Sequence, residues 1–204
     1  FKKDSSEKNY HLLTPKMLIR YAPGHMRDVK SGDRLKYTSL YDLNKVNEID
    51  VLENGLSASI GLNYEKRIIE SDGDIGPKKI ELSIGQVISE KENLDIPSAS
   101  SLEQRFSDVV GNASYKFNEK FDLTYDFALD QNYREFNYNE VGTSLKLDRA
   151  KFNINYLEEK QHIGNQKYVK SDFNIDINES ANLSFETKRN LLTNSAEFYN
   201  LSYD

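Results

Sequence analysis

Cysteine and tryptophan are absent from this chain of 204 residues, and proline occurs only 4 times. Without cysteine, these residues can form neither a disulfide nor a thiolate metal site. No apolar run approaches the roughly 20 residues that a membrane-spanning helix needs. The formal net charge is -6 and no dense cluster of lysine and arginine is present, which argues against nucleic acid as a partner. A helical membrane protein and a disulfide-stabilised domain are therefore excluded.

The chain is dominated by segments in which apolar and polar residues alternate. In FDLTYDFALD, from Phe121 to Asp130, one parity is Phe, Leu, Tyr, Phe, Leu and the other is Asp, Thr, Asp, Ala, Asp. Successive side chains of a β-strand point to opposite faces, so such a strand has one apolar and one polar face. No segment shows a sustained helical period. We predict about ten strands, near residues 10–22, 55–67, 79–90, 107–117, 120–130, 138–148, 150–160, 166–177, 181–190 and 195–203.

The connections between these strands alternate between two kinds. Tight polar turns are expected at 117–120, 147–151 and 178–182, and longer loops at 130–137, 158–166 and 189–195. In an antiparallel meander, alternate connections lie at opposite ends of the sheet, so one end carries turns and the other carries loops. The long segments 23–54 and 91–106 then belong to the loop end, while 67–79 is longer than expected for the turn end.

The predicted fold class is all-β, an antiparallel meander forming part of a transmembrane outer-membrane β-barrel, with residues 1–204 as a single partial barrel domain. Many strands reach about ten residues, the length of a tilted membrane strand. A soluble β-sandwich or solenoid is the alternative, but the polar faces are continuous over whole strands. Aromatic residues near the strand ends could form interfacial girdles: Tyr21, Tyr64, Tyr115, Phe117, Phe121, Tyr156, Tyr168, Tyr199 and Tyr203.

One strand has an ambiguous register. Phe136 and Tyr138 have the opposite parity to Val141 and the apolar residues that follow it. A β-bulge near Asn139–Glu140 would reconcile the two parities, or the first pair could belong to the preceding loop.

An ordered series of motifs resembles the C-terminal barrel region of the LptD family of lipopolysaccharide-assembly proteins. The segment LTPKMLIRYAP matches through Leu13, Thr14, Pro15 and Tyr21, and ENGLSASIGLNYE and LSIGQVI follow it in order. No single motif is specific, and residues 23–50 are only loosely similar. The family's cysteines, periplasmic jellyroll and first and last strands are not matched, so the resemblance implies part of a barrel wall. The segment that begins with FSDVVG at Phe106 also matches the family. Its matching residues are Ser107, Asp108, Val109, Val110, Gly111, Tyr115, Asn118, Leu123, Tyr125 and Asp126.

The resemblance implies a location in the outer membrane of a Gram-negative bacterium and a role in lipopolysaccharide transport, without covalent chemistry or a cofactor. It implies an LptE-like plug lipoprotein in the lumen and an LptA-like periplasmic bridge that docks through the jellyroll. The residues expected to face the lumen are Asp122, Thr124, Asp126, Asn153, Asn155, Asp172, Asn174, Asp176, Ser184 and Glu186. Those expected to face lipid are Leu123, Tyr125, Phe127, Phe152, Ile154, Tyr156, Phe173, Ile175, Leu183 and Phe185.

Two other kinds of outer-membrane barrel remain as alternatives. A porin or adhesin would usually show a basic strip facing an acidic constriction loop, which the sequence does not identify. A hydrolase working at the rim would need a serine, a histidine and an aspartate together. His25 and His162 fall in predicted outer loops without a recognisable partner, and His11 is equally isolated. We therefore predict surface histidines, no metal site and no enzyme.

Overall fold

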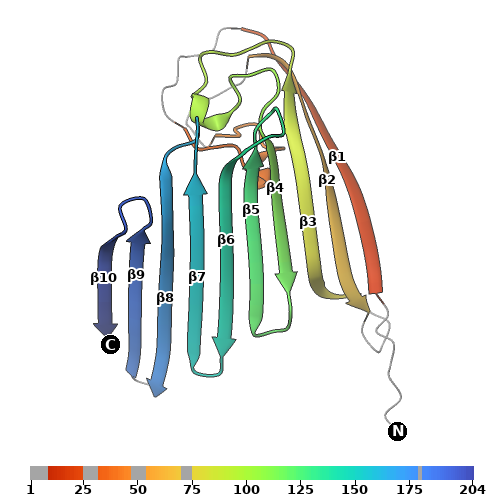
Figure 1. Cartoon of the computed structure of the whole chain (residues 1–204). Coiled ribbons are helices and arrows are strands. Elements are labelled where there is room, and N and C mark those ends of the chain that lie inside the picture. Colours follow the sequence, from red (N-terminus) through yellow and green to blue (C-terminus); the bar gives the residue numbers. More distant parts are fainter. Residues whose placement is uncertain (1–8, 25–31, 47–53, 70–74, 179–180) are drawn as a thin grey trace.

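The chain forms one antiparallel sheet of ten strands in which every strand pairs with its neighbours in sequence, from β1 to β10 (Figure 1). The computed structural model describes residues 9–24, 32–46, 54–69, 75–178 and 181–204. Within them, β1 pairs only with β2 and β10 only with β9, so the sheet is open there. The strands are β1 (Asn9–Ala22), β2 (Gly55–Ile69), β3 (Ile75–Ser89), β4 (Val109–Lys116), β5 (Phe121–Leu129), β6 (Phe136–Leu147), β7 (Ala150–Glu159), β8 (Gln166–Asn178), β9 (Ala181–Asn190) and β10 (Ser195–Tyr203).

The predicted strands are confirmed, with bounds that differ by a few residues. Helix is limited, among the described residues, to two short 3-10 turns, η1 (Tyr37–Ser39) and η2 (Ser98–Ser100). No helix in this part of the chain has the length and hydropathy of a membrane span.

The connections separate into a loop end and a turn end, as the alternation predicts. Figure 1 shows the long connections at the top and the tight turns at the bottom. Segments 91–108, 130–135, 160–165 and 191–194 lie at the loop end. The connection between β2 and β3, which the sequence predicted at 67–79, is shorter than predicted, because β2 continues to Ile69 and β3 begins at Ile75. The residues left between them, 70–74, lie outside the described residues.

The strand register divides the side chains between two faces. One row of cross-strand partners, which defines the apolar face, is Phe121, Leu145, Phe152, Phe173, Phe185 and Leu201. The neighbouring row, which defines the polar face, is Asp122, Ser144, Asn153, Asp172, Glu186 and Asn200. The ten residues expected to face a lumen all lie on the polar face. The ten expected to face lipid all lie on the apolar face, and what each face contacts stays a prediction.

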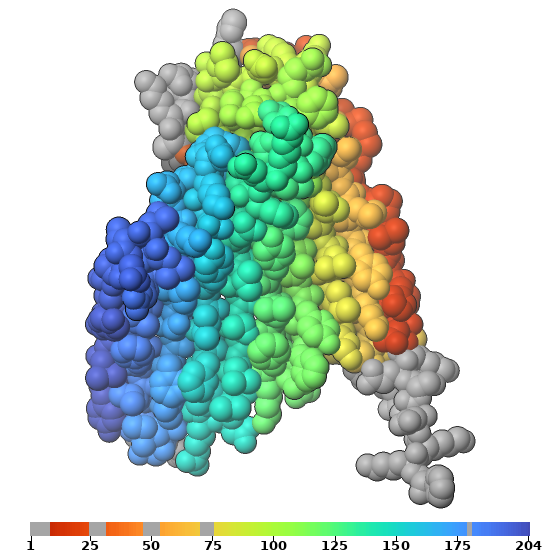
Figure 2. Space-filling view, in the orientation of Figure 1, coloured from red at the N-terminus to blue at the C-terminus, as the bar shows by residue number. Residues whose placement is uncertain are grey.

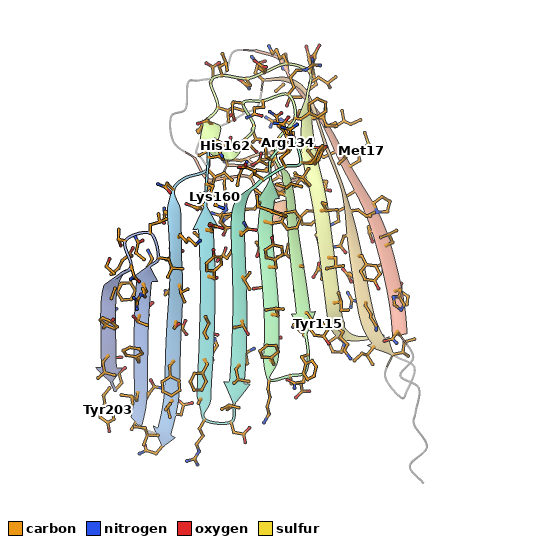
Figure 3. The ribbon with its side chains drawn as sticks, in the orientation of Figure 1. Met17, Tyr115, Arg134, Lys160, His162 and Tyr203 are labelled. Atoms are coloured by element: carbon orange, nitrogen blue, oxygen red, sulfur yellow. The ribbon has the colours of Figure 1, made fainter. Side chains whose placement is uncertain are left out.

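Aromatic rings pack side by side along the apolar face. The rings of Phe152 and Phe173 lie 4.3 Å apart, and Phe127 stacks on Tyr125 at 5.5 Å. Phe127 also covers Gly111 of β4, where a β-carbon would collide with the ring. No described segment covers this face: Ile154 remains 49% exposed and Met17 63%. Figure 3 shows Met17 on β1, and Tyr115 and Tyr203 towards the turn end.

The ambiguous register of β6 is resolved at a different place from the one predicted. The pairing with β5 shifts between Ala128 and Leu129, which face Tyr138 and Phe136, so Asn137 is the extra residue. From Tyr138 onward β6 is regular, and no bulge occurs at Asn139–Glu140. The bulge puts Phe136 on the apolar face, where its ring lies 5.8 Å from that of Phe127. It leaves Tyr138 on the polar face.

One of the aromatic residues predicted for an interfacial girdle, Tyr168, lies on the polar face. Tyr168 is paired with Leu157 and Asn190 on the polar face, where it packs against the buried cluster described below. The amino group of Lys188 lies 4.2 Å from the centre of its ring. Its hydroxyl therefore cannot belong to an aromatic belt on the apolar face.

A charge placed on either face tests the assignment. Phe127→Lys puts an amino group among aromatic side chains of the apolar face, and we expect a loss of about 2–4 kcal/mol of unfolding free energy in a bilayer. Asp126→Asn, on the adjacent polar position, should cost much less. Urea unfolding of the full-length protein in lipid vesicles measures both. Equal losses at the two positions would contradict the facing.

Candidate functional site

The polar face changes character along the strands. Towards the loop end, its positions are apolar and buried in five consecutive strands: Val87, Val110, Ala128, Tyr138 and Leu157. They form one cluster with Leu35, Leu40 and Val46 from the segment before β2 and with Ile96 and Leu102 from the segment before β4. The loop end of the polar face is therefore covered by two of the chain's own connections.

The first of these connections, the 33–46 loop, lies flat on the polar face. The Asp33 N–H donates to the carbonyl of Val46 at 3.0 Å and joins the two ends of the loop. Leu40, which is fully buried, packs on Gly85, and the hydroxyl of Tyr41 lies over Gly61. A β-carbon at either glycine would collide with these side chains, so the paired glycines of β2 and β3 form the recess that admits the loop. Figure 1 shows η1 of this loop behind the upper ends of β4 and β5.

Two tyrosines and a lysine hold the other side of the 33–46 loop. The Lys16 amino group of β1 lies 5.9 Å and 5.7 Å from the ring centres of Tyr37 and Tyr41. The two rings meet edge to face at 6.0 Å. Burial and the neighbouring Tyr37 raise the pKa of Tyr41 to about 12, so its phenol stays neutral at physiological pH. Arg20 donates to the carbonyl of Leu43 at 2.9 Å.

Arg34 joins the loop to the middle of the sheet. Its guanidinium lies 3.5 Å from the ring centre of Tyr138 and reaches Glu140 at 3.7 Å and Glu159 at 3.6 Å. Glu140 also accepts hydrogen bonds from the Tyr138 hydroxyl and from the Asn155 amide. A planar guanidinium can stack on the ring while it faces two carboxylates, which a lysine could not do. A small cavity beside Arg34 has a volume of about 170 Å³.

Below the loops, the polar face is lined by pairs of asparagine amides and carboxylates on adjacent strands. In each pair a side-chain amide donates to a carboxylate on the neighbouring strand, which links the two strands through their side chains. Three of the carboxylates, Glu81, Glu140 and Glu186, also have a lysine or arginine within ion-pair distance. The pairs are Asn63–Glu81 at 3.0 Å, Asn112–Asp126 at 2.8 Å, Asn155–Glu140 at 2.6 Å, Asn182–Asp176 at 2.8 Å, Asn200–Glu186 at 3.3 Å, and Asn153–Asp172.

Ion pairs on the same face cross-link neighbouring strands. Lys146 lies 3.5 Å from Asp122, and Lys170 lies 2.6 Å from Glu186. Asp172 and Glu186 are direct cross-strand partners, so Lys170 separates two like charges. The predicted lumen residues thus contact the adjacent strands in separate polar pairs, and Thr124 and Ser184 do so through their hydroxyls.

His162 was predicted to be an unpaired surface residue, and that prediction is wrong. Its Nε2 lies 3.2 Å from Oδ2 of Asp108, which is 1% exposed and also accepts from the Asn137 amide at 2.9 Å. Three segments of the loop end meet at this carboxylate: 91–108, 160–165 and the bulge of β6. Figure 3 shows His162 at the loop end, near Arg134 and Lys160.

The serines beside this pair do not form a nucleophilic triad with it. The Ser107 hydroxyl donates to the carbonyl of Asp108 and accepts from the Val87 N–H, and the Ser101 hydroxyl accepts from the Asp108 N–H. Both hydroxyls thus serve backbone groups, whereas a nucleophile must be hydrogen-bonded to its base. His25 lies outside the described residues. Within the described ranges, no group of three or more histidine, aspartate or glutamate side chains is arranged to hold a metal ion.

The sequence reasoning missed the residues that cover the loop end, although a signal was present. On the polar parity of β3 to β7, every strand has an apolar residue at or one position away from its loop end: Val87, Val110, Ala128, Tyr138 and Leu157. Such a row on an otherwise polar face requires a covering segment, because exposed apolar patches are otherwise uncommon. The position of Arg34 and the Asp108–His162 pair had no comparable local signal.

The recess of the 33–46 loop gives a test by glycine substitution. Gly85→Ala would place a β-carbon against Leu40 and 2.7 Å from the carbonyl oxygen of Ile60. We expect the loop to be displaced and to be cut several times faster by an added protease, since an overpacked contact costs about 1–3 kcal/mol. Gly142→Ala is the matched control, because its β-carbon meets only the rotatable Thr124 hydroxyl. Equal cleavage in both variants would show that the recess does not position the loop.

The His162–Asp108 pair predicts a pH dependence at the loop end. The hydrogen bond to Asp108 raises the pKa of His162 above its usual 6.5, against the effect of burial, and Glu103 and Asp130 act in the same direction as Asp108. The raised pKa means that the pair stabilises the folded loop fully below about pH 6.5 and loses this effect as pH rises through the folded pKa. Hydrogen exchange of segment 160–165, corrected for intrinsic rates, should therefore accelerate from pH 6 to pH 8.

His162→Gln should abolish this extra pH dependence. The matched control is His11→Gln, which removes an exposed histidine that bonds the Tyr64 hydroxyl at 2.8 Å on β1. An unchanged pH profile in His162→Gln would show that the pair does not anchor the loop.

The comparisons with known proteins agree with the fold and the two-faced sheet. No curated protein matches the chain. The sequence model of a protein family described as "LptD: LPS transport system D" matches residues 2–192. This match spans nearly all of the sheet, from before β1 to the loop that follows β9. The chain therefore belongs to the LptD family, a family of lipopolysaccharide transport and assembly proteins of the Gram-negative outer membrane.

Proposed function

We propose that this sheet is part of the wall of an outer-membrane barrel that inserts lipopolysaccharide into the outer leaflet, with residues 1–204 as a single partial barrel domain. The observation that carries the proposal is the division of the strands into an apolar and a polar face, together with membership of the LptD family. The apolar face contacts acyl chains, and the polar face lines a hydrated lumen.

The covered loop end indicates where the lumen is accessible. The 33–46 and 91–108 segments close the polar face at the loop end, whereas no described segment covers the Asn153–Asp172 and Asn182–Asp176 pairs farther down. An LptE-like plug lipoprotein would therefore enter from the turn end and contact the row from Asp122 to Glu186. In the same orientation, the turn end is periplasmic and the loop end is extracellular, as in other barrels of this class.

Lipopolysaccharide would arrive from the periplasm through an LptA-like bridge and the family's jellyroll, and leave into the outer leaflet. The wall performs no covalent step on it. A porin or a rim-site hydrolase has no specific feature in its favour here, since both serine hydroxyls beside His162 are bonded to backbone groups.

Photo-crosslinking from each face tests the proposal. A benzophenone amino acid at Asp172 or Asn155, on the polar face, should capture the plug lipoprotein when the full-length protein is expressed in cells. The same group at Phe173 or Ile154, one residue away in sequence on the apolar face, should capture none. Depletion of the full-length protein should also reduce the lipopolysaccharide reaching the cell surface. Capture of the plug from the apolar positions, or unchanged surface lipopolysaccharide, would refute the proposal.

A further inference from the structure

A group of cations lies on the apolar side of the sheet where β7, β8 and β9 reach the loop end. It consists of Lys160, Lys167 and Arg189, with Glu158 as the carboxylate among them, and is here named the rim cluster. Lys160 and Lys167 lie 3.3 Å and 3.1 Å from the same oxygen of Glu158. The Leu191 N–H donates to the carbonyl of Lys167 at 2.8 Å. Arg189 pairs with Val169, which makes it the diagonal neighbour of Lys167 on the same face.

The rim cluster follows directly on the apolar residues. Along β7, the outward positions read Phe152, Ile154, Tyr156 and then Glu158, and along β8 they read Ile175, Phe173, Ser171, Val169 and then Lys167. The change from apolar to charged side chains occurs at the same height on both strands, beside Tyr156. Tyrosine is enriched where acyl chains meet headgroups, so the cluster is at headgroup level on the proposed orientation.

The charges of the rim cluster are unbalanced and accessible. Two lysines share one carboxylate, with Arg189 as a further cation beside them, and the Lys160 side chain is 53% exposed while Lys167 is 37% exposed. Arg189 is exposed and, among the described residues, its hydrogen bond goes to the Asn194 side chain, at 2.7 Å. Glu158 is only 16% exposed, so it orients the two amino groups from below while their outer sides stay free. At the opposite end of these strands the outward residues are apolar, as at Ala150, Ile175 and Leu183.

We propose that the rim cluster is a binding site for the phosphate groups of a phosphorylated lipid in the leaflet at the loop end. The proposal rests on the proposed function, which supplies the membrane orientation. A guanidinium and two amino groups beside an apolar belt complement a headgroup phosphate whose acyl chains lie along Tyr156, Val169 and Phe173. On the polar face, by contrast, lysines such as Lys146 and Lys170 lie directly against carboxylates, at 3.5 Å from Asp122 and 2.6 Å from Glu186.

The test is a titration of the full-length protein in detergent with lipid A that carries two phosphates, followed by native mass spectrometry. The variant Lys160→Gln/Lys167→Gln/Arg189→Gln should weaken binding by about a hundredfold, given the contribution of each of the three cations near an anionic lipid. The matched control is Lys116→Gln/Lys120→Gln/Lys151→Gln, which removes three exposed lysines from the turn end and should bind normally. The charge-preserving variant Lys160→Arg/Lys167→Arg/Arg189→Lys should also bind.

Several outcomes would overturn the site. They are equal binding by the rim variant and the wild type, equal loss in the turn-end control, and undiminished binding of lipid A from which the phosphates have been removed. Binding of inorganic phosphate as tight as that of lipid A would also overturn the assignment to a lipid. If the wild-type protein binds lipid A but its depletion leaves surface lipopolysaccharide unchanged, the proposed function is refuted. The rim cluster would then still stand as a lipid-binding site.

Discussion

Hydrogen bonding between sequence-adjacent strands is the constraint on which the rest of this structure depends. Backbone amide and carbonyl groups in a bilayer need partners within the protein, and from β2 to β9 every strand finds them on both sides. Once this ladder is fixed, the period of two assigns each residue to a face. The aromatic rows on one side and the asparagine–carboxylate pairs on the other are consequences of that register.

The polar face is divided into two zones by what covers it. At the loop end, small residues on β2 and β3 admit Leu40 and Tyr41, and apolar residues on β3 to β7 bury the two connections. Farther down, amide and lysine side chains pair with carboxylates of adjacent strands. Within the described residues, the polar face is thus covered by the chain's own connections at one end and lined by paired polar side chains at the other.

The pattern of alternation was sufficient to locate the strands, because each strand repeats the same local signal and pairs with its neighbours in sequence. The same pattern failed in β6, where Tyr138 was expected to need a bulge after it. The extra residue is Asn137, and it is selected by its amide bond to the buried Asp108, which is distant in sequence. Tyr168 was predicted to lie in an interfacial girdle but packs against the buried cluster. The sequence could not distinguish the two, since a tyrosine occurs at membrane interfaces and in protein cores alike.

The sequence by itself determined the ten strands, the order in which they pair, the two ends of the sheet and the division of residues between two faces. These depend on neighbours along the chain and on a period of two. Only the tertiary structure decided that the 33–46 loop folds onto Gly61 and Gly85, that Arg34 reaches Glu140 and Glu159, and that His162 meets Asp108. Those contacts join segments far apart in the chain, and their geometry exists only after the ladder has formed.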